Sequence, residues 1–224
     1  MGRSVFIGIP SYSWTVYLPT MRSLMADCMA LAQRGDTFTI YDEAVATEIS
    51  QARNQIVDAF LHSNCTDLVF VDADVNWQAG SLLKLVDYPV DFVAGIYRKR
   101  IDNEEYPVRW MKERDTLIAD PETGLLEVEA VPGGFVALTR QCVAHMSMHY
   151  AETLTQRTDR ALNETWTALF DPMWVDGVRL PEDFTFCHRW RDMGGTVWID
   201  PEITMGHCGP KAFTGSIGSW LRNR

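Results

Sequence analysis

One short stretch, Leu68-Val69-Phe70-Val71-Asp72-Ala73-Asp74, constrains the fold more than any other part of the sequence. Four consecutive apolar residues suit a strand that is buried on both faces, as in a parallel sheet covered by helices. The chain should then leave the sheet at its carboxyl edge with Asp72 and Asp74, where ligand sites of open α/β sheets lie. Carboxylates held there suit Mg²⁺ or Mn²⁺ bound to substrate phosphates. Taken alone, Asp-x-Asp is equally compatible with a solvated turn.

Composition limits the classes of protein that this chain can represent. Its 224 residues, 46% of them hydrophobic, suffice for one α/β domain with a sizeable core. No segment approaches the roughly 18 uncharged apolar residues of a membrane span, and the charged N-terminus leads directly into a strand, unlike a signal peptide. We therefore expect a cytoplasmic protein. A formal charge of −10 argues against a nucleic acid or an anionic membrane as the main partner.

The cysteines indicate reduced thiols. There are five of them, an odd number, and no two form a C-x-x-C pair. A disulfide framework or a structural zinc site is therefore not expected.

The order of strands and helices predicts the sheet. Apolar runs and helical spacing alternate as strand, helix, strand, helix, strand up to Val71, which is typical of a parallel sheet with helices on both faces. Residues 102–129 predict a β-hairpin excursion, and the polar residues 151–166 predict a solvent-facing helix or a flap. The expected strands cover 5–9, 37–41, 68–71, 92–96, 135–138 and, as the last one, 196–199. The expected helices begin at caps Thr20 and Ser50, and others cover 80–86, 141–150 and 181–193.

Polar residues beside these elements are candidates for a site. The loop Pro10-Ser11-Tyr12-Ser13 could hold a base or ribose, and Asp42 follows the second strand at the edge expected for Asp72. Arg53 lies near a helix N-terminus, where the dipole disfavours a cation, so we expect an anionic partner. A surface pair with Glu48 is the alternative.

Two further pairs carry two interpretations each. Gly133 and Gly134 precede a strand, where paired glycines permit close approach of the backbone to another group, or form a bulge. Glu182 and Asp183 occupy the first turn of a helix, where they stabilise the helix dipole. That role does not exclude a second one.

Taken in order, these motifs resemble those of GT-A fold glycosyltransferases, especially the family-2-like enzymes that use nucleotide-diphosphate sugars. The matching segments are the nucleotide loop Ile9-Pro10-Ser11-Tyr12, the helix start Ala52-Arg53-Asn54, the D-x-D motif Asp72-Ala73-Asp74, the glycine segment Val131-Pro132-Gly133-Gly134-Phe135, the E-D pair Glu182-Asp183, and His207-Cys208-Gly209.

The resemblance implies a fold and a metal site. It implies one GT-A (Rossmann-like) domain over 1–224, with a nucleotide-binding half to about residue 100 and an acceptor half after it. A departing nucleoside diphosphate must be neutralised, and the chain has no G-x-x-x-x-G-K-[ST] loop, so Mn²⁺ or Mg²⁺ is expected. The resemblance assigns Asp74 and His207 to the metal as direct ligands, and Asp72 to a ribose or sugar hydroxyl and to a water-mediated contact with the metal. The implied donor-binding residues are Pro10, Ser11, Tyr12, Asp42, Arg53, Asp72, Ala73, Gly133, Gly134 and Lys211.

The resemblance also implies an activity. It is metal-dependent transfer of a sugar from a nucleotide-diphosphate donor to a hydroxyl acceptor such as a glycan, with UDP favoured by family frequency. Asp183 is the implied general base of an inverting reaction, supported by Glu182. The residues after D-x-D and the late His207 are also similar to those of retaining enzymes, so the stereochemistry stays open.

Other possibilities also stay open. The sequence is compatible with two roles of Lys211, which could contact the diphosphate or be solvated. Tyr12, Arg98 and Trp77 are further candidate contacts. The alternatives in function are a sugar nucleotidyltransferase, which normally has a Gly- and Arg-rich loop after its first strand, and a non-catalytic carbohydrate-binding module. The chain could also be a domain of a larger protein.

Overall fold

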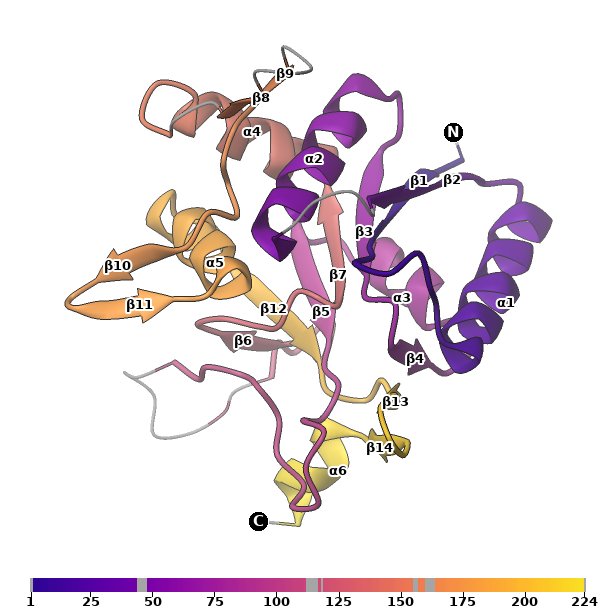
Figure 1. Cartoon of the computed structure of the whole chain (residues 1–224). Coiled ribbons are helices and arrows are strands. Elements are labelled where there is room, and N and C mark those ends of the chain that lie inside the picture. Colours follow the sequence, from indigo (N-terminus) through magenta and orange to yellow (C-terminus); the bar gives the residue numbers. More distant parts are fainter. Residues whose placement is uncertain are drawn as a thin grey trace.

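A seven-stranded mixed sheet forms the centre of the molecule, in the order β2-β1-β3-β7-β5-β12-β6 (Figure 1). The computed structural model describes residues 2–43, 48–111, 117, 119–154, 157–159 and 164–223. Five strands run in one direction, and β6 and β7 run opposite to them. The strands are β1 (Ser4–Pro10), β2 (Thr37–Glu43), β3 (Asp67–Val71), β5 (Phe92–Gly95), β6 (Leu126–Val128), β7 (Phe135–Thr139) and β12 (Val197–Asp200).

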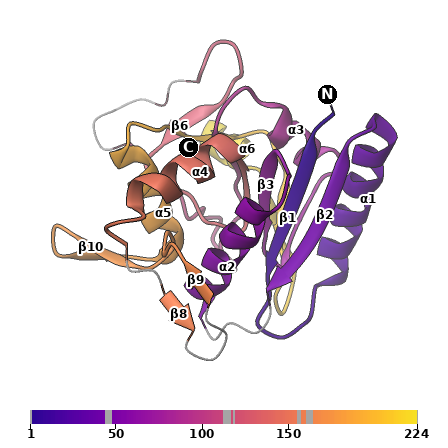
Figure 2. The same ribbon diagram turned by 90° about the horizontal axis from the view of Figure 1, so that it is seen from above.

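Helices cover both faces of this sheet (Figure 2). In β1, Val5 and Ile7 pack in the cluster under α1 and α3, while Phe6 packs in the cluster under α2, α4 and α5. This alternation follows from the two-residue period of a strand. The predicted fold class, a mainly parallel sheet between helices, is confirmed. The helices are α1 (Leu18–Arg34), α2 (Ile49–His62), α3 (Ser81–Asp87), α4 (Arg140–Tyr150) and α5 (Glu182–Asp192).

A second, three-stranded sheet was not expected from the sequence. It consists of β4 (Val75–Trp77), β13 (Met205–His207) and β14 (Phe213–Gly215), with β13 in the middle and antiparallel to both neighbours. The prediction that 196–199 is the last strand is therefore wrong, since β13, β14 and α6 (Ile217–Arg222) follow it. Strands of three residues are too short to show a period in the sequence.

Other local predictions also need correction. Thr20 and Ser50 lie inside α1 and α2, whose N-caps are Tyr17 and Glu48. Pro19 in the first turn of α1 and Gly35 at its C-cap, with φ of 86°, are the true boundary signals. In the polar stretch 151–166, β8 (Arg157–Asp159) and β9 (Glu164–Trp166) form an antiparallel pair instead of a helix, and 155–156 and 160–163 lie outside the described residues.

The excursion at 102–129 is less regular than a hairpin. Two isolated antiparallel bridges, between Arg109 and Ala130 and between Ala119 and Leu126, connect its two sides, and β6 continues into the main sheet. Residues 112–116 and 118 lie outside the described part of the chain. A further hairpin, β10 (Met173–Val175) with β11 (Val178–Leu180), precedes α5. No described helix is both long and apolar enough to cross a bilayer.

A buried carboxylate fixes the segment that follows D-x-D. Asp27 on α1 is fully buried and accepts hydrogen bonds from Trp77 Nε1 at 2.8 Å and from the Leu82 amide at 2.9 Å. The Trp77 ring stacks on Phe135 with 4.5 Å between centroids, which places it in the core and not in a ligand site. The five cysteines are all buried and unbonded to one another.

Candidate active site

A pocket of about 370 Å³ lies at the carboxyl edge of β1 and β3. It is lined by the loop after β1, the start of α2, the D-x-D segment and the start of α5. These segments are distant from one another in the sequence. Most of the predicted site residues therefore meet in one place. The lining residues are Pro10, Ser11, Tyr12, Ser13, Thr15, Tyr17, Ile49, Arg53, Asp72, Ala73, Asp74, Tyr97, Glu182 and Asp183.

The Arg53 side chain forms the floor of this pocket. This side chain is only 3% exposed. Its Nη2 lies 2.9 Å from Asp72 Oδ1, and its Nε lies 3.8 Å from Glu182 Oε1. Its Nη1 donates to the Gly133 carbonyl at 2.8 Å. Burial would lower the pKa of Arg53, but Asp72 and Glu182 outweigh it and keep this pKa above its ordinary value. The expected anionic partner is thus confirmed, and a surface pair with Glu48 is excluded.

The paired glycines are where the backbone must come close to this charge. A Cβ on Gly133 would lie 2.8 Å from Arg53 Cζ, and one on Gly134 would lie 2.5 Å from Asp72 Oδ2. The pairing of β3 with β7 runs without interruption up to Phe135, and the Asp72 amide donates to the Gly134 carbonyl at 2.9 Å, so the same register continues to Gly134 without a bulge. The close-approach interpretation is confirmed, and it concerns Arg53 and Asp72.

Asp74 and His207 lie side by side because β4 pairs with β13. Val75 faces His207 in this register, and the Cys208 amide donates to the Asp74 carbonyl at 2.7 Å. As a result His207 Nε2 lies 3.5 Å from Asp74 Oδ2. Burial would raise the pKa of Asp74, but the hydrogen bond with His207 and the charges of His207 and Arg100 hold it below its ordinary value.

The tautomer of His207 leaves a ligand nitrogen facing the carboxylate. Its Nδ1 lies 3.0 Å from the Arg98 carbonyl, which can only accept, so Nδ1 carries the proton. Nε2 then faces Asp74 Oδ2, where a proton on Nε2 or a cation between the two atoms can join them. A histidine oriented through its second nitrogen is the usual arrangement in metal sites.

These two groups fit a dication only in part. Among the described residues, no group of three or more His, Cys, Asp and Glu side chains could hold a metal ion. Asp72 is engaged by Arg53, and its Oδ2 accepts from Tyr97 at 3.5 Å. Mg²⁺ is commonly bound by one or two carboxylates and completes its shell with substrate phosphates and water. Asp74 fits that pattern, whereas the imidazole of His207 is a ligand type more usual for transition metals.

Asp183 differs from an ordinary surface carboxylate. Burial and the neighbouring Glu182 raise the pKa of Asp183 to about 6, and Arg53 limits the rise. Its Oδ1 accepts from the Phe184 amide at 2.8 Å. A carboxylate with such a pKa is ionised at neutral pH and can still accept a proton there.

Several predicted contacts do not line the pocket. Lys211 is 60% exposed and forms an ion pair with Asp102. Asp42 is exposed at the end of β2. Arg98 donates to the Ile101 and Asp102 carbonyls, both at 3.0 Å. Their roles toward a donor stay predictions.

Sequence reasoning missed Tyr97 and the role of Arg100. Tyr97 lies between Asp72 and His207, with its ring edge-to-face against the imidazole at 4.8 Å. It directly follows the strand ending near Ile96, so its place at the same sheet edge was a usable signal. Arg100 Nη1 lies 3.1 Å from Asp74 Oδ2, a contact that no local pattern in the sequence indicates.

Comparisons with known proteins agree with this fold. No family model matches the chain, and no curated protein matches it significantly. The crystal structure of A197 from STIV is similar with a TM-score of 0.55 and 17% identity, over 96% of this chain and 91% of that one. GalNAc-T7 with UDP, GalNAc and Mn²⁺ is similar with a TM-score of 0.50 and 12% identity, over 92% of this chain and 44% of that one. The chain has a GT-A-like fold.

The raised pKa of Asp183 predicts a pH-dependent effect of Asp183→Asn on stability. A carboxyl whose pKa rises from 3.8 to about 6 on folding stabilises the protein while protonated, and this contribution is lost as pH rises from about 4 through 6. At pH 7 the free energy of unfolding of the variant should exceed that of the wild type by about 1–3 kcal/mol, so the variant should be the more stable protein. Below about pH 4 the two should be equal.

Urea denaturation of both proteins at several pH values measures this difference. Asp176→Asn, in the exposed turn between β10 and β11, controls for removal of a surface carboxylate. A difference that does not change with pH would contradict the environment assigned to Asp183.

Proposed function

We propose that this protein is a metal-dependent glycosyltransferase that moves a sugar from a nucleotide-diphosphate donor, with UDP favoured, to a hydroxyl acceptor such as a glycan. The observation that carries the proposal is one pocket lined by both Asp74 and Asp183, with His207 Nε2 beside the pocket at 3.5 Å from Asp74 Oδ2. Asp74 and His207 would supply an oxygen and a nitrogen ligand beside the leaving group. Asp183 would supply a carboxylate that can take a proton.

The donor would lie across the carboxyl edge of the sheet. The residues from the first half of the chain, including Tyr12 and Tyr17, provide aromatic surface for a base. Ser11 Oγ is buried and has no hydrogen-bond partner among the described residues, which suits a hydroxyl of the nucleoside. Asp74 and His207 would hold Mn²⁺ or Mg²⁺, which neutralises the charge that develops on the diphosphate.

Asp183 would remove the proton from the acceptor hydroxyl. It lies on α5, across the pocket from the loop after β1, and its raised pKa makes it a stronger base than a free aspartate. Glu182 contributes by raising that pKa, and Arg53 forms ion pairs with Glu182 and Asp72. These roles describe an inverting reaction; a retaining reaction would use the same metal ligands without a base.

The direct test is release of free nucleotide from a panel of nucleotide sugars with Mn²⁺ and glycan acceptors. We expect Asp74→Asn and His207→Gln to lower turnover at least a hundredfold, because each removes a ligand beside the leaving group. Asp102→Ala, an exposed carboxylate that pairs with Lys211, is the matched control and should remain active.

Three outcomes contradict the assignment. Turnover that persists in excess chelator or in the Asp74 variant excludes the metal role. Activity that requires a nucleoside triphosphate and a sugar phosphate identifies a nucleotidyltransferase. Nucleotide binding without release identifies a binding module.

The pH profile tests Asp183 separately. The value of kcat/KM should rise with pH around a midpoint near 6, because Asp183 must be ionised to accept a proton. Glu182→Gln removes a charge that raises this pKa, so its acid limb should move to lower pH. Glu105→Gln, an exposed carboxylate paired with Lys99, should leave the limb in place. An acid limb that is unchanged in Glu182→Gln would exclude Asp183 as the base.

A further inference from the structure

Arg100 competes for the same carboxylate oxygen that faces His207. Its Nη1 lies 3.1 Å from Asp74 Oδ2, and His207 Nε2 lies 3.5 Å from that same atom. Nη1 also donates to the Cys208 carbonyl at 3.2 Å. A guanidinium therefore occupies the position beside Asp74 in which a cation would be held.

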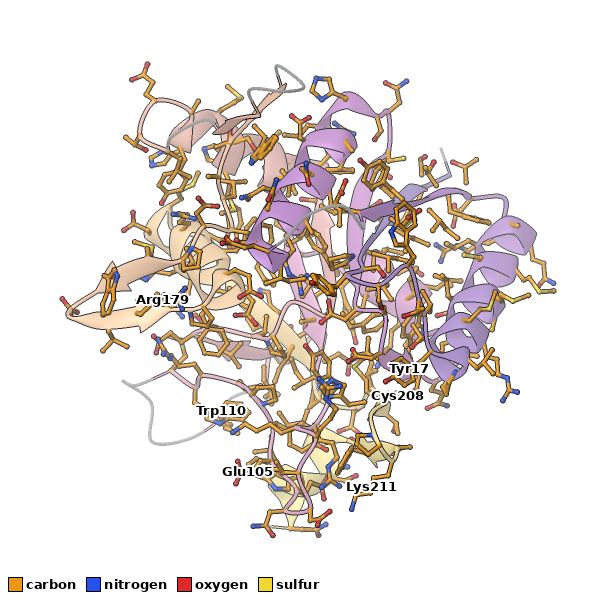
Figure 3. All side chains as sticks on the ribbon, viewed as in Figure 1. Tyr17, Glu105, Trp110, Arg179, Cys208 and Lys211 are labelled. Atoms are coloured by element: carbon orange, nitrogen blue, oxygen red, sulfur yellow. The ribbon has the colours of Figure 1, made fainter. Side chains whose placement is uncertain are left out.

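The segment around Arg100 is attached to the C-terminal segment at several points. The Arg98 carbonyl accepts from His207, and Asp102 pairs with Lys211. Gly209 lies so close that a Cβ there would be 3.0 Å from Arg100 Cδ. In Figure 3 the labelled Glu105, Cys208 and Lys211 all lie at the end of the molecule that carries the small sheet.

The Arg100 side chain is free to leave this position. It is 46% exposed, so its withdrawal would leave no void in the core. Its bonds go to Asp74 and to one backbone carbonyl, and a half-exposed ion pair contributes little to stability. The contact is therefore better suited to balancing the charge of Asp74 than to holding the fold.

We propose that Arg100 is a built-in counter-cation that competes with the divalent metal for Asp74 and so sets the affinity of the site. The inference rests on the proposed function, because it assumes that Asp74 and His207 hold the metal. A guanidinium and a dication repel each other and cannot both occupy Asp74 Oδ2. Metal loading then requires Arg100 to withdraw, which lowers the affinity of the wild type.

Mn²⁺ binding to the full chain without nucleotide, followed by electron paramagnetic resonance, tests this competition. Arg100→Ala should bind Mn²⁺ roughly three- to tenfold more tightly than the wild type, because the competing charge is gone. Arg100→Lys should bind Mn²⁺ with intermediate affinity, since it keeps the positive charge and loses the planar guanidinium with its paired N–H donors. Lys99→Ala, which removes the adjacent cation paired with Glu105, should bind as the wild type does. Circular dichroism verifies that each variant folds.

The outcomes separate this inference from the proposed function. Equal or weaker binding by Arg100→Ala, with binding still lost in Asp74→Ala, overturns the competition and leaves the metal site intact. Absence of Mn²⁺ binding in the wild type and in Arg100→Ala overturns the metal assignment itself. Tighter binding by Lys99→Ala to the same extent as Arg100→Ala would show a general charge effect and also overturn the inference.

Discussion

The candidate site depends on the ion pairs that the buried guanidinium of Arg53 forms. This guanidinium connects α2 to Asp72 at the end of β3, to the Gly133 backbone and to Glu182 at the start of α5. A charge buried to this degree is tolerated only with partners, because the loss of a partner leaves a buried charge uncompensated. Asp72 and Glu182 are therefore held by one cation, and their positions depend on each other.

A second constraint comes from the small sheet. The pairing of β4 with β13 brings His207 to Asp74, and a carbonyl of the Arg98 segment sets the orientation of the imidazole. In the proposed metal site the fold would thus supply two ligands and leave the remaining coordination to substrate and water. This arrangement suits a site in which the leaving group itself completes the metal shell.

The central sheet could be predicted because its signals are local. The apolar run before Asp72 and the helical spacing of apolar residues in α2 can each be recognised within a short stretch of sequence. The structure confirms the strand and the helix that they predict. Gly133 and Gly134 were also informative, since only a close contact or a bulge explains such a pair. The helix starts were less predictable, because Thr20 belongs inside α1 despite its capping chemistry.

The rest depends on tertiary contacts that no local pattern records. The strands of the small sheet have three residues each, so the proximity of His207 to Asp74 could be expected only from the family resemblance. The contact of Arg100 with Asp74 arises from the path of an irregular loop. Tyr97 is intermediate, because the strand before it was predicted and its partners were not.

Anomalous diffraction from a crystal grown with MnCl₂ and UDP tests most directly whether Asp74 and His207 hold the metal. We expect a manganese peak in contact with Asp74 Oδ2 and His207 Nε2, with the diphosphate of UDP as a further ligand and the base near Tyr12. A peak elsewhere, or UDP bound with Asp74 and His207 free of metal, would contradict it.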